Sequence, residues 1–138
     1  MFSGCTSLTK APELPAKSLD SGCYAYMFEG CTSLVGVPEI LPATTLRDRC
    51  YQGMFYGCTA LTEAPKLPAL ILSVGSYAYM FNRCAKLNYV KALFTDKSAG
   101  SCTEGWLDGV SSSGTFVKNA AATWNVVGAS GVPEGWTV

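Results

Sequence analysis

Apolar and small residues recur along the chain at a nearly constant interval. Each copy starts with Met-Phe, has a cysteine at its fifth position and reaches a leucine at its eighth, and in the first three copies that cysteine lies within Gly-Cys-Thr. The copies begin at Met1, Met27, Met54 and Met80, so the three steps are nearly equal and the middle one is longer by a single residue. A fixed period of this length is typical of a solenoid, in which each coil stacks only on its neighbours.

The period continues once more in an altered form. The sequence Trp-Leu-Asp-Gly-Val at 106–110 stands one further period after the copy that begins at Met80, and Cys102 is in register with Cys23 and Cys50. We therefore expect a degenerate fifth coil from about residue 102. The column that tests this expectation consists of Met1, Met27, Met54, Met80 and Trp106.

Each coil combines a stretch of strand character with a stretch of helical character. Residues 35–37 and 88–90 follow a repeat leucine and would pair from coil to coil as a parallel sheet, with prolines ending the strands. Residues 19–28 have the pattern of a short helical turn, which Gly30 could end in a left-handed conformation. One extra residue near Ile40 explains the longer middle step.

The repeat motif resembles a known family. The sequence Gly-Cys-Thr-Ser-Leu occurs at 4–8 and 30–34, and Gly-Cys-Thr-Ala-Leu occurs at 57–61. These motifs are similar to the BspA-like class of bacterial surface leucine-rich repeats, in a variant common in gut Bacteroidales. The resemblance implies an α/β solenoid, a leucine-rich-repeat array with a short parallel sheet on one side, short helical turns on the other and a C-terminal β cap. We expect repeats over residues 1–117 and a capping segment over 118–138.

Composition excludes several classes of partner. The 138 residues are 49% hydrophobic but only 14% charged, and ten basic residues balance ten acidic ones. Nucleic acid is not expected as a partner, because phosphate binding needs clustered Lys or Arg. Membrane insertion is not expected either, since no apolar run approaches the length of about 18 residues that a spanning helix needs. No signal peptide is visible. Met1 lies inside the repeat consensus, so we expect a fragment of a longer array whose uncapped N-terminal coil could self-associate.

Seven cysteines form two rows at the repeat interval. Free buried thiols are the favoured interpretation, because Val110 fills one cysteine position and free Cys behaves as a compact hydrophobe. Disulfides between neighbouring coils remain an alternative, since stacked coils bring equivalent residues within bonding range. A metal site is the weakest alternative, because the chain has no Cys-x-x-Cys motif and no histidine.

Catalysis is not expected. Without histidine the chain cannot form a Ser-His or Cys-His nucleophile pair. Its scattered carboxylates occupy variable repeat positions, where a solvated surface charge is the default interpretation. We therefore expect no enzyme activity, no catalytic or metal-ligating residue and no cofactor.

Binding is expected on the outward face of the strand side. Its ligand-contact candidates are Lys10, Glu63, Asn88 and Tyr89, with a merely solvated polar face as the alternative. The helical side carries two rows of tyrosines, one with Tyr24, Tyr51 and Tyr77 and the other with Tyr26 and Tyr79. These rows could bind a glycan or a protein, but such rings more often pack along the coil.

These observations and the resemblance together predict a non-catalytic module that binds a protein or a glycan. By the resemblance, it would belong to a bacterial cell-surface or secreted protein. A structural spacer or stalk is one alternative, and an adhesion component of a phage tail is another.

Overall fold

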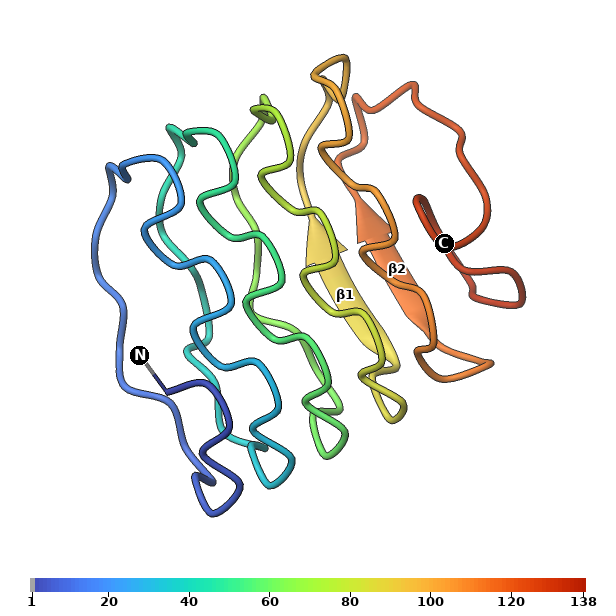
Figure 1. Ribbon diagram of the computed structural model, residues 1–138. Coiled ribbons are helices and arrows are strands. Elements are labelled where there is room, and N and C mark those ends of the chain that lie inside the picture. The colour runs from blue at the N-terminus through green and yellow to red at the C-terminus, as the bar shows by residue number, and fades with distance from the viewer. Residues whose placement is uncertain (1) are drawn as a thin grey trace.

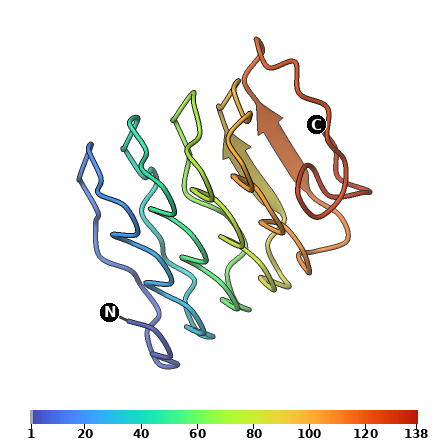
Figure 2. The same ribbon diagram turned by 45° about the horizontal axis from the view of Figure 1, so that its top comes forward.

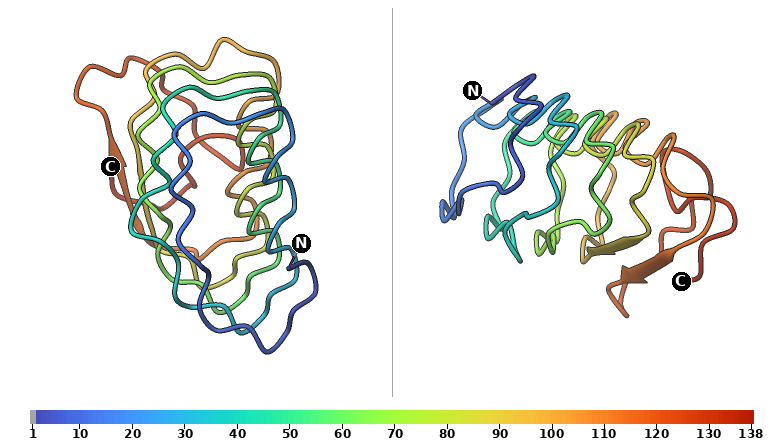
Figure 3. Two further views of the ribbon diagram at one scale, coloured as in Figure 1. Left: turned by 90° about the vertical axis from the view of Figure 1, so that its left-hand side faces the viewer. Right: turned by 90° about the horizontal axis from the view of Figure 1, so that it is seen from below.

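The chain winds in successive coils that lie side by side, with its two ends at opposite ends of the stack (Figure 1). The structure is a computed structural model that describes residues 2–138. Its only strands are β1 (Tyr89–Ala92) and β2 (Thr115–Lys118). They pair in parallel, with Tyr89 opposite Thr115, and form one two-stranded sheet. Seen along the stack, the coils lie behind one another (Figure 3).

The predicted fold class is wrong. Residues 2–138 contain no helix, and their two short strands do not make the α/β solenoid with helical turns that was expected. The leucine-rich-repeat and solenoid assignments that rested on this expectation are therefore not supported. The repeat period was detected correctly, but the local conformation inferred for each half of the repeat was not.

The side predicted to be helical is instead a run of tight turns. In residues 20–31 the amides of residues 23, 25, 27, 29 and 31 donate to the carbonyl three residues earlier, as in a β-turn. The amides of residues 22, 24, 26, 28 and 30 donate to carbonyls of the next coil. The same alternation recurs in 47–58 and 73–84, and these zigzag segments lie side by side in Figure 2.

Two physical causes exclude a helix from these turn segments. Left-handed φ angles recur at regular intervals, at Gly22, Tyr26 and Gly30 in the first full segment, and each one breaks the right-handed path that a helix requires. In addition, every second amide bonds to the neighbouring coil, so it cannot close the i to i−4 bond of a helix.

The strand side is joined by single parallel bridges more than by strands. Among residues 2–138, such bridges include Lys10 with Gly36, Ile40 with Lys66, and Glu63 with Tyr89. Residues 88–90 were predicted to have strand character, and β1 does include Tyr89 and Val90. Elsewhere the prolines that follow each short segment remove a ladder donor and keep the pairing short.

The core consists of side-chain columns that run along the stack. Phe2, Phe28, Phe55 and Phe81 stack with ring centroids 5.5 Å apart at each step. The carbonyl of Trp106 accepts from the amide of Phe81, just as the carbonyls of Met54 and Met80 accept from the preceding phenylalanines. Trp106 therefore continues the methionine column as predicted, while Met1 lies outside the described residues.

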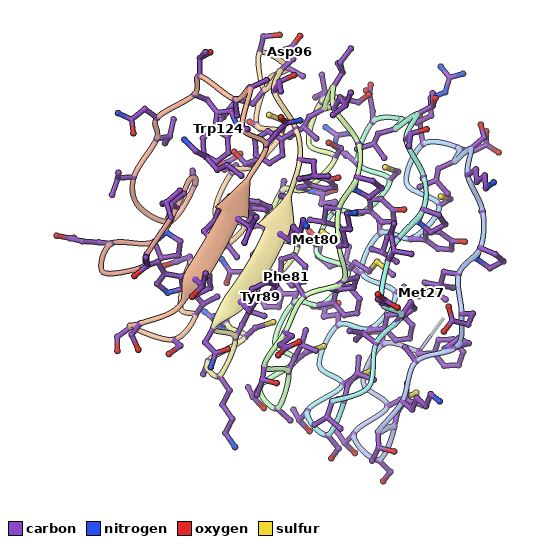
Figure 4. The ribbon with its side chains drawn as sticks, turned by 180° about the vertical axis from the view of Figure 1, so that it is seen from behind. Met27, Met80, Phe81, Tyr89, Asp96 and Trp124 are labelled. Carbon is purple, nitrogen blue, oxygen red and sulfur yellow. The ribbon has the colours of Figure 1, made fainter. Side chains whose placement is uncertain are left out.

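The C-terminal segment folds back over the last coil. The indole nitrogens of Trp124 and Trp136 donate to the carbonyls of Phe94 and Ser111, at 3.0 and 2.8 Å. Trp124 also stacks on Phe94 with centroids 4.8 Å apart, next to the end of β2 (Figure 4). Residues 119–138 form isolated bridges but no strand.

Candidate functional site

A change of register on the strand side lies beside a hollow of the described surface. Coils 1 to 4 are numbered by the methionines that start them, so coil 2 begins at Met27 and coil 3 at Met54. The ring of Phe28 stacks on that of Phe55, so coils 2 and 3 are aligned there with the longer of the two repeat intervals. Further along the same two coils, the bridge between Ile40 and Lys66 aligns them with the shorter repeat interval. The extra residue of coil 2 is therefore accommodated between these points, as its position near Ile40 predicted.

The ladder is interrupted where the register changes. Coils 1 and 2 are bridged at Lys10–Gly36, and coils 3 and 4 are bridged at Glu63–Tyr89. Within residues 2–138, no bridge and no backbone hydrogen bond joins residues 35–37 to 62–64. Pairing resumes where the Lys66 amide donates to the Glu39 carbonyl at 2.9 Å. Gly36 and Ala64 use their amides in bonds to the coils on either side, whereas the amides of Val37 and Glu63 donate no backbone hydrogen bond within residues 2–138.

These two segments, which are not paired with each other, border a hollow of about 680 Å³. We name it the strand-side hollow. Its polar lining includes Glu39, Thr62, Glu63, Lys66, Tyr89 and Lys91. Two carboxylates thus face two ammonium groups, so the hollow offers both signs of charge. Apolar surface adjoins them, because Ile40 and Val35 are 38% and 59% exposed. Such a mixture can bind backbone, charged and aliphatic groups of one ligand together.

The structure brings together three of the four predicted contact residues. Glu63 and Tyr89 line the strand-side hollow, and Tyr89 stands at the start of β1 (Figure 4). Asn88 joins these two residues in an adjoining hollow of about 430 Å³ against residues 113–115. Lys10 lies apart on coil 1, where its side chain covers Gly36: a Cβ on Gly36 would stand 3.1 Å from its Cγ.

Sequence reasoning missed the other charged residues of this hollow. Glu39, Lys66 and Lys91 occupy repeat positions that vary from coil to coil, so no repetition marks them. The usable signal was the single longer step of the repeat, because an extra residue in one coil must disturb the pairing on one side of it. That signal located the insertion, but its consequence for the ladder required the three-dimensional register.

All seven cysteines are free thiols, and five of them are buried. This bears out free buried thiols for the five, whereas Cys5 and Cys23 are exposed. The Cys31, Cys58 and Cys84 thiols donate to the carbonyl of a phenylalanine in the preceding coil, at 3.0, 3.1 and 3.0 Å, respectively. The cysteine ladder is thus a hydrogen-bonded structural element.

Burial keeps the interior thiols protonated near neutral pH. Desolvation raises the pKa of Cys50 to about 11 and that of Cys58 to about 12. A thiolate is the form that attacks electrophiles or binds metals, so these residues are poorly suited to either role. Residues 2–138 hold no group of three or more Cys, Asp or Glu placed to bind a metal ion.

No helix within residues 2–138 has the length and apolar character needed to cross a membrane. No protein-family model, curated protein or solved structure matches this chain.

Proposed function

We propose that this chain is a non-catalytic interaction module that binds a protein or glycan ligand. The observation that carries the proposal is the interrupted ladder of the strand-side hollow. The amides of Val37 and Glu63, which donate no backbone hydrogen bond within residues 2–138, lie there beside side chains of both charges. A surface with these groups is suited to recognition, and the buried, protonated thiols favour binding over catalysis.

An extended polypeptide is the ligand that the strand-side hollow favours. An extended chain can add its own backbone hydrogen bonds to unpaired strand-like segments, while alternate side chains reach the flanking groups. Glu63 and Lys66 lie on the same coil and would select basic and acidic side chains, respectively. The half-buried ring of Tyr89 supplies an aromatic contact at the edge of β1.

The setting of the module follows from the sequence resemblance alone. Repeats similar to those of bacterial surface antigens suggest a protein at the cell surface or secreted from the cell. A structural spacer is the second candidate. It is favoured by the continuous coil-to-coil hydrogen bonding of the turn segments and by the stacked phenylalanine column, both of which stiffen the molecule along its length.

The test is a selection from a displayed library of random linear peptides, followed by titration of the selected peptides. We expect them to lose about tenfold or more in affinity for the double variant Glu63→Ala/Tyr89→Ala, as is typical when an interface anchor is truncated. Lys10→Ala is the matched control, because Lys10 occupies the same face but lies outside the hollow.

The spacer interpretation predicts a different outcome. A module that only separates other domains would enrich no peptide, or would bind peptides equally well in wild type and in the double variant. Either result would remove the strand-side hollow as a recognition surface.

A further inference from the structure

A second hollow lies on the opposite side of the molecule, across the turn segments. Its volume is about 520 Å³, and its lining includes Tyr26, Glu29, Tyr56, Tyr79, Arg83 and Asp108. These residues come from four successive segments, 20–31, 47–58, 73–84 and 101–109. We name it the turn-side hollow. It shares no lining residue with the strand-side hollow.

Strained backbone is concentrated in this hollow. Among residues 2–138, five residues other than glycine have positive φ angles, and three of them, Tyr26, Tyr79 and Arg83, line it. The equivalent positions in neighbouring coils are glycines, for example Gly53 for the tyrosines and Gly57 for Arg83. Glycine adopts a left-handed conformation without steric cost, whereas a bulky residue does not. Such strain is typical of ligand-contact sites.

The two tyrosines form a spaced pair of aromatic platforms. The residues at this repeat position alternate as Tyr26, Gly53, Tyr79 and Gly105. Each ring lies over the glycine of the next coil: a Cβ on Gly53 would clash with the Tyr26 ring, and one on Gly105 would stand 2.9 Å from Cε1 of Tyr79. The rings are thereby set two coils apart, about 10 Å by the spacing of hydrogen-bonded backbone segments.

These rings do not serve the interior stack. The other tyrosine row does: Tyr24, Tyr51 and Tyr77 stack in sequence at 6.0 and 6.1 Å. Packing along the coil, the favoured interpretation for both rows, therefore takes the form of ring stacking in this row, whereas the Tyr26 and Tyr79 rings pack on glycines of the next coil. Tyr26 is 36% exposed, and Tyr79 is partly exposed. Interaction with the neighbouring Glu104 carboxylate raises the pKa of the Tyr79 hydroxyl.

Polar groups are arranged around the rings. The guanidinium of Arg83 lies 5.7 Å from the centroid of the Tyr56 ring. Tyr56 belongs to segment 47–58, which lies between the segments that carry Tyr26 and Tyr79. Carboxylates of Glu29 and Asp108 flank the hollow on either side along the stack. The side-chain amide of Asn82, which also lines the hollow, is held by donation to the Gly105 carbonyl at 2.9 Å.

We infer that the turn-side hollow binds a neutral oligosaccharide, with pyranose rings packed on Tyr26 and Tyr79 and hydroxyl groups bonded to Glu29, Arg83 and Asp108. The electron-rich face of a tyrosine ring attracts the C–H groups on the face of a sugar. Carboxylates and a guanidinium together match hydroxyl groups, which both donate and accept. Two platforms separated by two coils match successive sugars of an extended chain better than a single compact ligand.

Charge selects a neutral ligand over an acidic one. Two carboxylates face one guanidinium, so a saccharide that carries its own carboxylate or sulfate would meet net repulsion. A peptide is disfavoured here for a different reason. Each of the segments 20–31, 47–58 and 73–84 already uses its amides in turns and coil-to-coil bonds, and no open backbone ladder remains for a partner chain.

The test is calorimetric titration with neutral oligosaccharides of two to six units, in a panel of gluco-, manno- and N-acetylglucosamine-based chains. We expect at least one of them to bind wild type, and the double variant Tyr26→Gly/Tyr79→Gly to weaken that binding by about tenfold or more. Glycine is the natural residue at the equivalent positions 53 and 105, so this variant keeps the backbone conformation.

Arg49→Gly is the matched control. Arg49 also has a positive φ angle, its counterparts Gly22 and Gly75 are glycines, and it does not line the hollow. It should relieve the same kind of strain and leave saccharide binding unchanged. The inference is overturned if no oligosaccharide of the panel binds wild type, or if the tyrosine variant binds equally well. Glu63→Ala/Tyr89→Ala should retain saccharide binding, which separates this inference from the proposed function.

Discussion

Ser76 is the one buried side chain of the described residues whose polar atom has no hydrogen-bond partner. It stands in the row of Cys23, Cys50 and Cys102, where a thiol would be less costly to bury than a hydroxyl. We expect Ser76→Cys to raise the free energy of unfolding by about 1 to 3 kcal/mol, which is the usual cost of an unsatisfied buried group. Urea denaturation measures this change.

Ser73 provides the control for this substitution. Its hydroxyl donates to the Leu46 carbonyl at 2.8 Å, so it is satisfied. Ser73→Ala should lower the free energy of unfolding, and a loss of stability in Ser76→Cys as well would show that the hydroxyl of Ser76 has a favourable role.

The raised thiol pKa values predict how stability depends on pH. Burial raises the pKa of Cys58 from 9.0 to about 12, so the folded state retains a proton that the unfolded state loses above pH 9. The stabilisation is therefore complete below pH 9 and is lost as the pH rises from 9 toward 12. Cys58→Val should reduce the slope of unfolding free energy against pH above 9, since Val110 already fills the equivalent position in coil 5. An unchanged slope in denaturation at pH 8 to 10.5 would contradict this assignment.

At the scale of elements, the residue that a turn segment tolerates at one position depends on the residue at the equivalent position of the neighbouring coil. Gly53 has a φ of 57° and lies directly under the Tyr26 ring, whereas Gly30 has a φ of 70° and a Cβ there would meet its nearest atom, in Gly4, at an ordinary contact distance of 3.8 Å. We expect Gly30→Ala to cost about 1 to 2 kcal/mol, the penalty of a left-handed alanine, and Gly53→Ala to cost more. Thermal unfolding compares the two variants.

The excess cost of Gly53→Ala should depend on the tyrosine. In a Tyr26→Gly background the clash disappears, so the two alanine substitutions should then cost the same. If Gly53→Ala remains the more damaging substitution in that background, the ring does not account for the difference.

The period and the columns could be predicted from the sequence, but the conformation of the turn segments could not. Strict spacing marked the methionine column and placed Trp106 in it. The apolar pattern of residues 19–28 also suits a helical turn, and nothing local shows that alternate amides bond to the next coil. Gly22 and Gly30 carried part of the missing signal, whereas the left-handed Tyr26 that completes the pattern has no such signature.

The two candidate sites were predictable to different degrees, because the period shows which positions are equivalent but not how each side chain is oriented. Glu63, Asn88 and Tyr89 were identified because outward strand-side positions follow from the period. Lys10 satisfied the same rule, yet it covers Gly36 instead of lining the hollow. The turn-side hollow required knowledge that Tyr26 and Tyr79 project outward while Tyr51 and Tyr77 stack inside.

At the scale of the whole molecule, one extra residue makes the strand side irregular while the turn side stays regular. The turn segments keep their coil-to-coil bonds along the stack, while the strand side loses pairing between residues 35–37 and 62–64. Residues 37–43 read Val-Pro-Glu-Ile-Leu-Pro-Ala, and coil 1 has Ala-Pro-Glu-Leu-Pro-Ala at 11–16. Deleting Ile40 would therefore give coil 2 the length and motif of coil 1.

The affinity of the Ile40 deletion variant for the selected peptides tests the central claim most directly. The deletion gives coils 2 and 3 a single register, so the ladder should close, the strand-side hollow should disappear and the thermal midpoint should be retained or rise. We expect that the variant, shown by its thermal unfolding to be folded, no longer binds peptides that wild type binds. Binding by the folded deletion variant with wild-type affinity would contradict the claim that the interrupted register creates the recognition surface.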